Sequence, residues 1–179
     1  MKLRTGFRAA LACLGMALAI AACGSAGSAG GPGGGPAAGG AVPASYSIGQ
    51  IRQQMLVAVN QYRTSQGLGA LNLDPDLDSA AQAHAADMAA RGVLSHTGSD
   101  GSSAGDRVLR VGYRYREYAE NIAQGQASVA ETVQSWIDSP GHRANMLLPA
   151  VADLGVGFAE GPPTGRVPGR FWVIVLGVR

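Results

Sequence analysis

The chain has 179 residues, of which 46% are hydrophobic, 15% charged and 6% aromatic, a length that excludes a multi-domain machine. Three of its fourteen basic residues lie before residue 10, which leaves eleven against twelve acidic residues, a net charge of −1, and no basic patch for nucleic acid. Lys2 is the only lysine and no cysteine follows Cys23, so the rest of the chain has no P-loop lysine, disulfide, thiolate zinc site or cysteine nucleophile.

The first 22 residues have the layout of a secretory signal peptide. A basic start precedes an apolar run, residues 9–22, that is too short for a comfortable membrane span. The run ends in Ile20-Ala21-Ala22-Cys23, which resembles the bacterial lipobox. We therefore expect Cys23 to carry acyl chains that anchor the protein to the outer side of the cytoplasmic membrane. The alternative is an ordinary signal, cleaved near Ala22, and a secreted product.

Residues 23–45 combine this cysteine with a tether rich in Gly, Ala and Pro. Between residues 24 and 44, nine of 21 residues are Gly, three are Pro and none is charged or aromatic, so no core can form there. A flexible segment of this length reaches roughly 25 Å. The folded domain is thus expected to span residues 46–179, lifted just off the membrane.

Hydrophobic spacing predicts two long helices at the start of this domain. The first runs from Ile48 to a stop at Gly67, and its apolar positions are Ile51, Met55, Val59 and Tyr62. In the second, Asp74 and Pro75 are the expected N-cap and first residue, and Gly92 is the expected end.

The remaining elements are shorter. In chain order they are a polar loop (93–105), a short helix (106–112), an ambiguous segment that suits an edge strand passing into a turn (113–123), a helix (129–137), a further helical turn or two from Pro140, and two strands (154–158 and 171–176) joined by a hairpin-type loop. Helices followed by C-terminal strands imply an α+β layered domain, with one sheet covered on both sides.

Two of the three histidines lie among small polar residues. These are His96 and His142, whereas His84 is four residues before Met88 on a predicted helix and is expected to be packed. If the turn after Pro140 is helical, its N-terminal dipole keeps the His142 imidazole neutral, as metal binding requires. Glu120 lies in an apolar segment and needs a partner if it is buried.

These residues leave several kinds of chemistry open. Two histidines with carboxylates suit a divalent metal and equally suit general acid–base catalysis. Spacing alone favours a third interpretation, in which each is a satisfied loop residue, because no pair of ligands has the i, i+4 relation of one helix face. Residues 101–105 match G-x-S-x-G, but a polar loop precedes them where a nucleophile elbow needs a strand.

Four segments in this order resemble the CAP superfamily, also called the SCP-like extracellular domain. They are AHAADM (83–88), LSHTG (94–98), AENIA (119–123) and WIDSPGHRANM (136–146). The similarity spans nearly all of residues 48–179 and is to the bacterial branch, which lacks the disulfides of many eukaryotic members. It implies an α+β fold, a three-layer α-β-α sandwich with a central cleft.

The resemblance also implies a site. Carried over from the family, His96, Asp106, Glu120 and His142 line the cleft and bind a divalent cation. Asp106 stands where many members have Glu, and Asp100 is the alternative to it. Such a mixed set of nitrogen and oxygen ligands favours zinc over calcium.

Two functional classes follow from the resemblance. The first is a binding module that presents its metal-containing cleft to a peptide, lipid or envelope ligand. The second is a metal-assisted hydrolase, a peptidase or cell-wall hydrolase, that would use Glu120, His142 and His96. We assign no catalytic residue, because no nucleophile with an orienting base is recognisable, and we expect a monomer that binds no nucleic acid.

Overall fold

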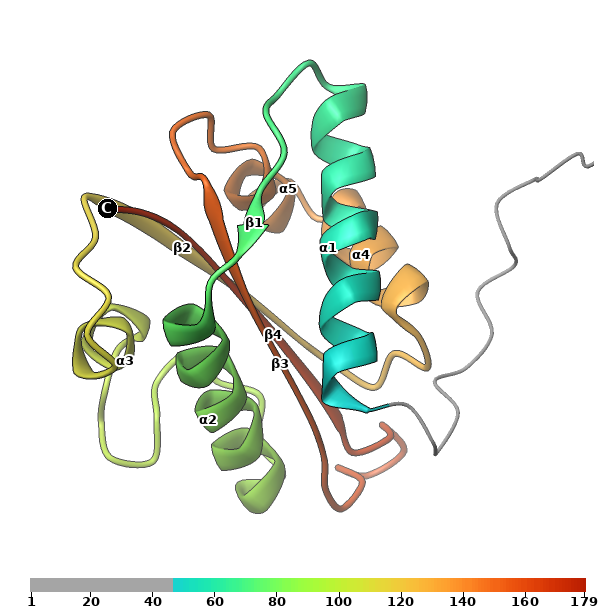
Figure 1. Cartoon of the computed structure of the whole chain (residues 1–179). Coiled ribbons are helices and arrows are strands. Elements are labelled where there is room, and N and C mark those ends of the chain that lie inside the picture. Colours follow the sequence, from blue (N-terminus) through green and yellow to red (C-terminus); the bar gives the residue numbers. More distant parts are fainter. Residues whose placement is uncertain (1–46) are drawn as a thin grey trace, which may run out of the picture. The chain divides into compact units, whose positions relative to one another are not determined.

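The computed structural model describes residues 47–179. The predicted signal peptide (1–22), Cys23 and the tether up to residue 45 lie outside the described residues. In chain order the elements are α1 (Ile48–Ser65), β1 (Asn72–Leu73), α2 (Pro75–Arg91), α3 (Ala104–Arg110), β2 (Glu117–Gln124), α4 (Val129–Asp138), α5 (Pro140–Met146), β3 (Asp153–Glu160) and β4 (Arg170–Val178) (Figure 1).

The two long helices begin and end where the sequence predicts. Asp74 caps α2 by accepting hydrogen bonds from the amides of Asp76 and Leu77, Pro75 is the first helical residue, and Gly92 ends the helix in the left-handed conformation. α3 begins two residues earlier than predicted, because Ser103 is its N-cap and forms a capping box with Asp106. Ser103 is also the serine of the G-x-S-x-G match, and the helix cap is its role here.

One four-stranded sheet has the order β1-β3-β4-β2, antiparallel except for the β1–β3 pair. β4 is central, which explains its unbroken apolar run. β2 is an edge strand, as predicted, but it stays extended up to Gln124 rather than passing into a turn. The two residues of β1 were not predicted, because they are too few to show an alternating pattern.

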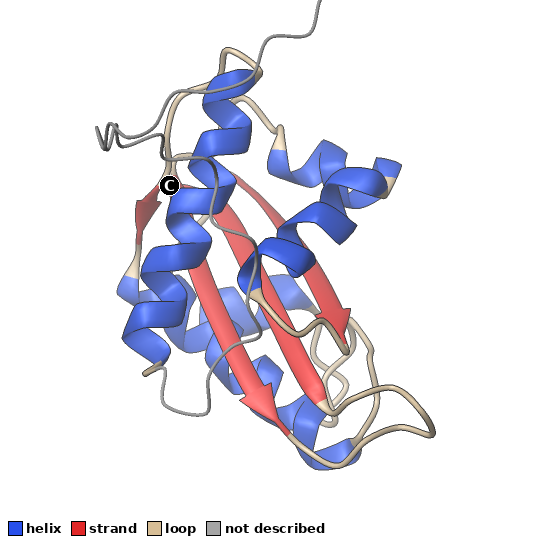
Figure 2. Ribbon diagram, turned by 90° about the vertical axis from the view of Figure 1, so that its right-hand side faces the viewer, coloured by secondary structure: helices blue, strands red, loops and turns tan. Residues whose placement is uncertain are grey.

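Helices cover both faces of this sheet (Figure 2). α1, α4 and α5 pack on one face in a cluster that includes Met55, Trp136 and Trp172. α2 and α3 pack on the other, with Leu77, Met88 and Val108. The predicted α-β-α sandwich is therefore confirmed. No helix within residues 47–179 is long and apolar enough to cross a membrane.

β3 lies so close to α2 that two of its positions must be glycine. A Cβ atom on Gly155 would overlap the backbone carbonyl of Leu77, and one on Gly157 would overlap that of Ala81. Glycine alternates with large residues in this strand because the helix and the sheet approach too closely for a side chain at these positions.

The outer edge of β3 beyond the short β1 is closed by side chains of α1 and α2. Asp78 accepts a hydrogen bond from the amide of Val156 (2.8 Å), and Arg52 donates to its carbonyl (3.2 Å). Gln82 bonds both the amide and the carbonyl of Phe158 (3.2 and 2.9 Å). Helix side chains therefore act as a substitute strand.

At the opposite edge of the sheet, side chains of α4 and α5 likewise bond to backbone carbonyls of β2. The indole nitrogen of Trp136 on α4 donates to the carbonyl of Ile122 (3.2 Å). The side-chain amide of Asn145 on α5 donates to the carbonyl of Glu120 (3.3 Å). These contacts bring α4 and α5 against the strand that carries Glu120.

Candidate functional site

Glu120 is the centre of the site. Its side chain is 3% exposed, and both of its carboxylate oxygens have close partners. Oε1 lies 2.8 Å from Nδ1 of His96, and Oε2 accepts a hydrogen bond of 2.7 Å from Nη2 of Arg107. The prediction that a buried Glu120 needs a partner is confirmed, and the partners are one imidazole and one guanidinium.

The ionised Glu120 carboxylate determines that Nδ1 of His96 carries a hydrogen. Burial alone raises the pKa of Glu120, but the hydrogen bond from His96 and the charge of Arg107 outweigh burial and bring that pKa below its usual value. Because an ionised carboxylate only accepts, Nδ1 of His96 carries the hydrogen of this bond, and Nε2 has no hydrogen-bond partner among residues 47–179. The His96 side chain is 58% exposed, so the ring is open to solvent.

His142 lies on α5, whose first turn is helical as expected. Burial lowers the pKa of His142, and the neighbouring His96 lowers it further. Asn121 donates from Nδ2 to the His142 carbonyl (2.9 Å) and accepts from Asn145 (2.9 Å). These bonds fix the backbone of α5 against β2 beside Glu120.

The two candidate aspartates have other roles. Asp106 is exposed, and its Oδ2 accepts from the amide and the hydroxyl of Ser103 (2.9 and 2.7 Å) at the start of α3. Asp100 accepts from the Ser102 amide (2.9 Å) and pairs with Arg110 (3.0 Å). Within residues 47–179, neither aspartate has a hydrogen bond or ion pair with Glu120, His96 or His142.

Arg107 lies where a second acid was expected. Successive residues of a helix are turned by about 100°, so Asp106 points back to the cap and its neighbour Arg107 points into the domain. The sequence did contain a signal for a buried Arg107. This arginine is next to Val108 and four residues before Val111, so it shares the apolar face of a short helix. A charge at that position needs a buried partner of opposite sign.

His84 supports the segment that carries His96. It is 1% exposed, and its Nε2 lies 2.8 Å from the carbonyl of Ser95 and 4.0 Å from Oε1 of Glu120. The prediction that His84 is packed is confirmed. Sequence reasoning missed its contact with the residue before His96, because eleven residues of loop and helix separate the two partners.

The donors available to a metal differ from the predicted set. Within the described residues, no group of three or more His, Cys, Asp or Glu side chains is placed to hold a metal ion. Both oxygens of Glu120 are already engaged, so the two imidazoles are the remaining donors. If a transition metal is bound, His96 and His142 would be its imidazole donors, and the Glu120 carboxylate would orient His96 from behind.

Acidification is expected to destabilise the domain. Burial lowers the pKa of His84 and of His142, so the unfolded chain takes up protons first as the pH falls. Their contribution to stability is full above about pH 6.5 and is lost as the pH falls below it. The lowered pKa of Glu120 adds a loss at lower pH. Urea unfolding at about pH 7.5 and about pH 5.5 measures the effect, and His142→Gln should reduce it. Equal stability at the two pH values would contradict this assignment.

The comparisons with known proteins agree with this fold. Residues 56–176 match the CAP family, described as the Cysteine-rich secretory protein family. The layered fold and this match define the chain as a CAP-type domain. The match covers most of the chain, which therefore belongs to the CAP family.

Two relatives from Bacillus subtilis (strain 168) are similar in sequence. The uncharacterized protein YkwD is 33% identical over 117 residues, which make up 65% of this chain and 46% of YkwD. The uncharacterized membrane protein YlbC is 30% identical over 105 residues, 59% of this chain and 30% of YlbC. The chain thus spans less than half the length of the curated relatives it matches.

Solved structures show the same architecture. An extracellular protein containing a SCP domain from Bacillus anthracis is 25% identical, with a TM-score of 0.63 over 75% of this chain and 44% of that one. An outer surface protein from Borrelia burgdorferi has a TM-score of 0.65 at 18% identity, over 79% of this chain and 99% of that one. At that identity, the second likeness shows the fold alone.

Proposed function

We propose that this protein is an extracytoplasmic, lipid-anchored binding module whose His96–His142 pair holds a divalent transition metal. The observation that carries the proposal is the buried Arg107–Glu120–His96 chain. It holds an exposed imidazole with Nε2 free, beside a second imidazole that burial keeps neutral. A carboxylate that fixes the tautomer of a histidine in this way is the usual support of a metal-binding imidazole.

The bound metal would supply a Lewis acid to which a ligand from the cell envelope, a peptide or a lipid, attaches. The chain's own residues determine the rest. Glu120 and Arg107 form a neutral pair, so their charges largely cancel, and Asn121 fixes the backbone at His142. Affinity would therefore depend on the two imidazoles.

A thermal melt with and without zinc tests the metal. Binding to the folded state alone adds RT ln(1 + [L]/Kd), about 2.7 kcal/mol at a hundredfold excess of zinc over Kd. The gain should shrink below about pH 6.5, because protons compete for the imidazoles. His96→Ala and His142→Ala should each abolish it.

Asp106→Asn is the matched control for this experiment. It changes a carboxylate that the family resemblance places in the site but that the structure places at the cap of α3. The zinc response should survive this change. The metal proposal would be overturned if zinc leaves the melting temperature of the unmodified protein unchanged at neutral pH, or if the zinc response persists in His142→Ala.

The lipid anchor is tested separately at Cys23. The Bacillus anthracis relative is described as extracellular and YlbC as a membrane protein, which supports a location outside the cytoplasm. Cys23→Ser is expected to move the protein from the membrane fraction to the soluble fraction, or to stop its processing. An unchanged mass and an unchanged membrane fraction would contradict lipidation.

A hydrolase is the second candidate, and the Glu120–His96 hydrogen bond favours it. A carboxylate that orients an imidazole is the arrangement of a general base. Within residues 47–179, however, no Ser or Thr hydroxyl is hydrogen-bonded to His96 or His142, so the nucleophile would have to be water. Hydrolysis of a peptide or cell-wall substrate that is lost in Glu120→Gln would establish this alternative.

A further inference from the structure

We propose that the end of the domain to which the tether is joined docks on the surface of a phospholipid membrane. Three exposed apolar side chains form the docking surface, which we call the apolar end patch. They are Val93, Leu94 and Val167, which are 47%, 44% and 42% exposed. The proposal rests on the lipid anchor of the proposed function, because membrane binding scales with the apolar area buried and three side chains bury little. A short link to the anchor raises the effective concentration to the order of 1 mM, at which a weak contact suffices.

The apolar end patch comes from two segments that are fastened together. Val93 and Leu94 directly follow Gly92, which ends α2, and Val167 lies in the turn of the β3–β4 hairpin. The amides of Thr164 and Val167 bond to each other's carbonyls (3.0 Å each). The Thr164 hydroxyl donates to the carbonyl of Gly92 (2.6 Å). The hairpin turn is therefore held at the residue before Val93, so the three apolar side chains belong to one surface.

The start of α1, where the tether joins the domain, is at this same end. Arg52, one turn into α1, donates to the carbonyl of Val156 in the second half of β3 (3.2 Å). Ala89, close to the end of α2, lies against Gly161, the first residue after β3. The start of α1, the end of α2 and the hairpin all lie at the bottom of the domain in Figure 1. The point of attachment and the apolar end patch thus share one end.

The length of the tether favours this end over the opposite one. α1 has 18 residues and is therefore about 27 Å long, so the opposite end is farther from the point of attachment by that length. The composition of residues 24–44 predicts a mean reach of roughly 25 Å. Turning the opposite end to the membrane would take up the whole of this reach, whereas the apolar end patch can meet the membrane without it.

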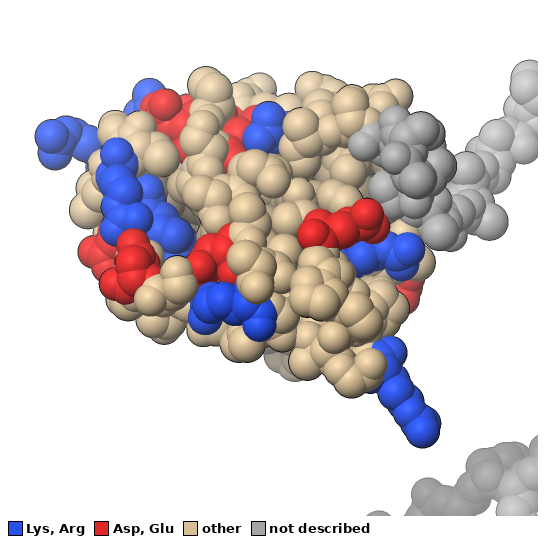
Figure 3. All heavy atoms as spheres, turned by 90° about the horizontal axis from the view of Figure 1, so that it is seen from below, with Lys and Arg blue, Asp and Glu red and all other residues tan. Residues whose placement is uncertain are grey.

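The charges at this end are compatible with a lipid surface. Two ion pairs flank the apolar end patch, Asp87–Arg91 (2.7 Å) and Glu160–Arg170 (3.3 Å), and the charges within each pair largely cancel. Figure 3 views this end and shows acidic and basic side chains next to each other, with larger areas of neither kind between them. Arg166 is exposed in the hairpin turn. A guanidinium group binds the phosphate that every phospholipid carries.

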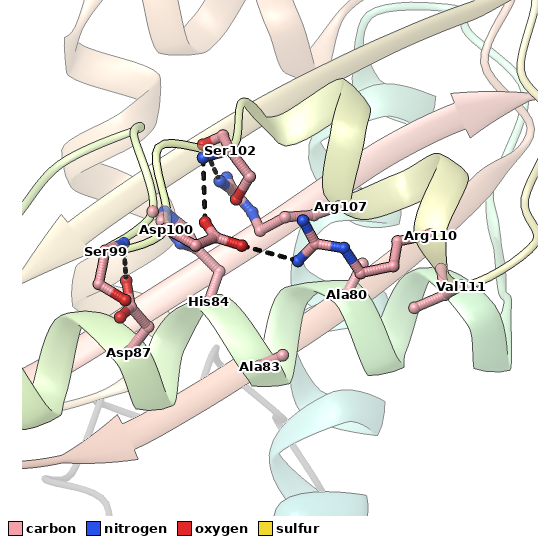
Figure 4. A pocket seen from close by; sticks show the side chains of 11 residues that line it. Ala80, Ala83, His84, Asp87, Ser99, Asp100, Ser102, Arg107, Arg110 and Val111 are labelled. Carbon is pink, nitrogen blue, oxygen red and sulfur yellow. Dashed lines mark hydrogen bonds and ion pairs between the residues drawn. The ribbon is translucent and has the colours of Figure 1, made fainter.

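The segment after α2 is held in place before any contact with lipid. Nε2 of His84 lies 2.8 Å from the carbonyl of Ser95. Asp87 accepts a hydrogen bond of 3.1 Å from the amide of Ser99 (Figure 4). A surface that is already formed loses little conformational entropy on binding. His96 lies between these two bonds, so docking would place the metal site of the proposed function beside the lipid headgroups.

Fluorescence quenching on the anchored, full-length protein tests the docking. A thiol-reactive fluorophore is attached at Pro163→Cys in the hairpin or at Gln66→Cys, where α1 ends; both positions are exposed. Cys13 lies in the predicted signal peptide and Cys23 would be acylated, so the introduced cysteine is the free thiol. The vesicles contain phosphatidylcholine and phosphatidylglycerol with brominated acyl chains. Quenching should be at least about threefold stronger at position 163 than at position 66, since a docked apolar surface lies about 5–10 Å into the boundary of headgroups and chains.

Two sets of substitutions complete the test. Val93→Ser, Leu94→Ser and Val167→Ser together should remove the quenching at position 163 and leave the protein in the membrane fraction. Val57→Ser with Leu109→Ser is the matched control, because these side chains are similarly exposed but lie outside the apolar end patch; it should change nothing. If the unmodified protein is absent from the membrane fraction, the anchor and the docking are both overturned. If it is present but quenched equally at the two positions, or if quenching survives the triple substitution, the docking alone is overturned.

Discussion

Arg107→Met is expected to lower the free energy of unfolding by about 3–5 kcal/mol, the usual cost of removing one member of a buried ion pair. The variant leaves the Glu120 carboxylate buried, with His96 as its remaining close partner. Burial raises the pKa of Glu120, and Arg107 opposes this effect. Without Arg107 the pKa of Glu120 should therefore rise. The melting temperature should fall by roughly 10 °C for a domain of this size, and the loss should be smaller at a pH low enough to protonate Glu120.

Two control variants separate this effect from a loss of packing. Arg110→Met removes an arginine of the same helix whose ion pair with Asp100 is exposed (62% for Arg110), and it should cost at most about 1 kcal/mol. Glu120→Gln combined with Arg107→Met removes both charges and should recover part of the stability. If the double variant is as unstable as the sum of the single ones, the pair is not the source of the effect.

Gly157→Ala is expected to destabilise the domain by about 3 kcal/mol or more, the upper range for forcing an extra methyl group into a packed interior. The new Cβ would overlap the carbonyl of Ala81, and that atom belongs to a helix backbone that cannot rotate away. α2 would have to move off the sheet, and it carries His84, so the support of His96 should weaken as well. Chemical denaturation measures the loss.

Gly69→Ala is the matched control. Nothing lies within 4 Å of a Cβ at Gly69, and its backbone is not left-handed, so the substitution should be neutral or stabilise slightly by restricting the unfolded chain. Equal stability of Gly157→Ala and Gly69→Ala would mean that α2 and β3 lie further apart in solution.

The parts of the fold that could be predicted are those whose signals are local. Asp74, Pro75 and Gly92 delimit α2 because caps act within one turn of a helix. The unbroken apolar run of β4 predicted its burial, since a central strand has helices on both faces. β1 could not be predicted, because its two residues form a strand only through their pairing with β3.

The site was harder to predict, since its geometry depends on rotation about a helix. His96, Glu120 and His142 came from the resemblance and are brought to one region of the domain. Asp106 also came from the resemblance, with Asp100 as its alternative. A shift of two residues in the start of α3 makes Asp106 part of a cap and turns Arg107 towards Glu120. Element boundaries are the least certain part of a sequence prediction, and here one boundary changes the charge of the site.

The closed edges of the sheet have a consequence for many copies of this domain at one surface. A bare outer strand is a template on which a second molecule can add its own strand and begin to aggregate. In this domain, backbone groups that an added strand would need are already hydrogen-bonded to the side chains of Asp78, Gln82, Trp136 and Asn145. Crowded copies of the domain would therefore meet through side chains of their helices and loops, and each sheet would remain within its own molecule.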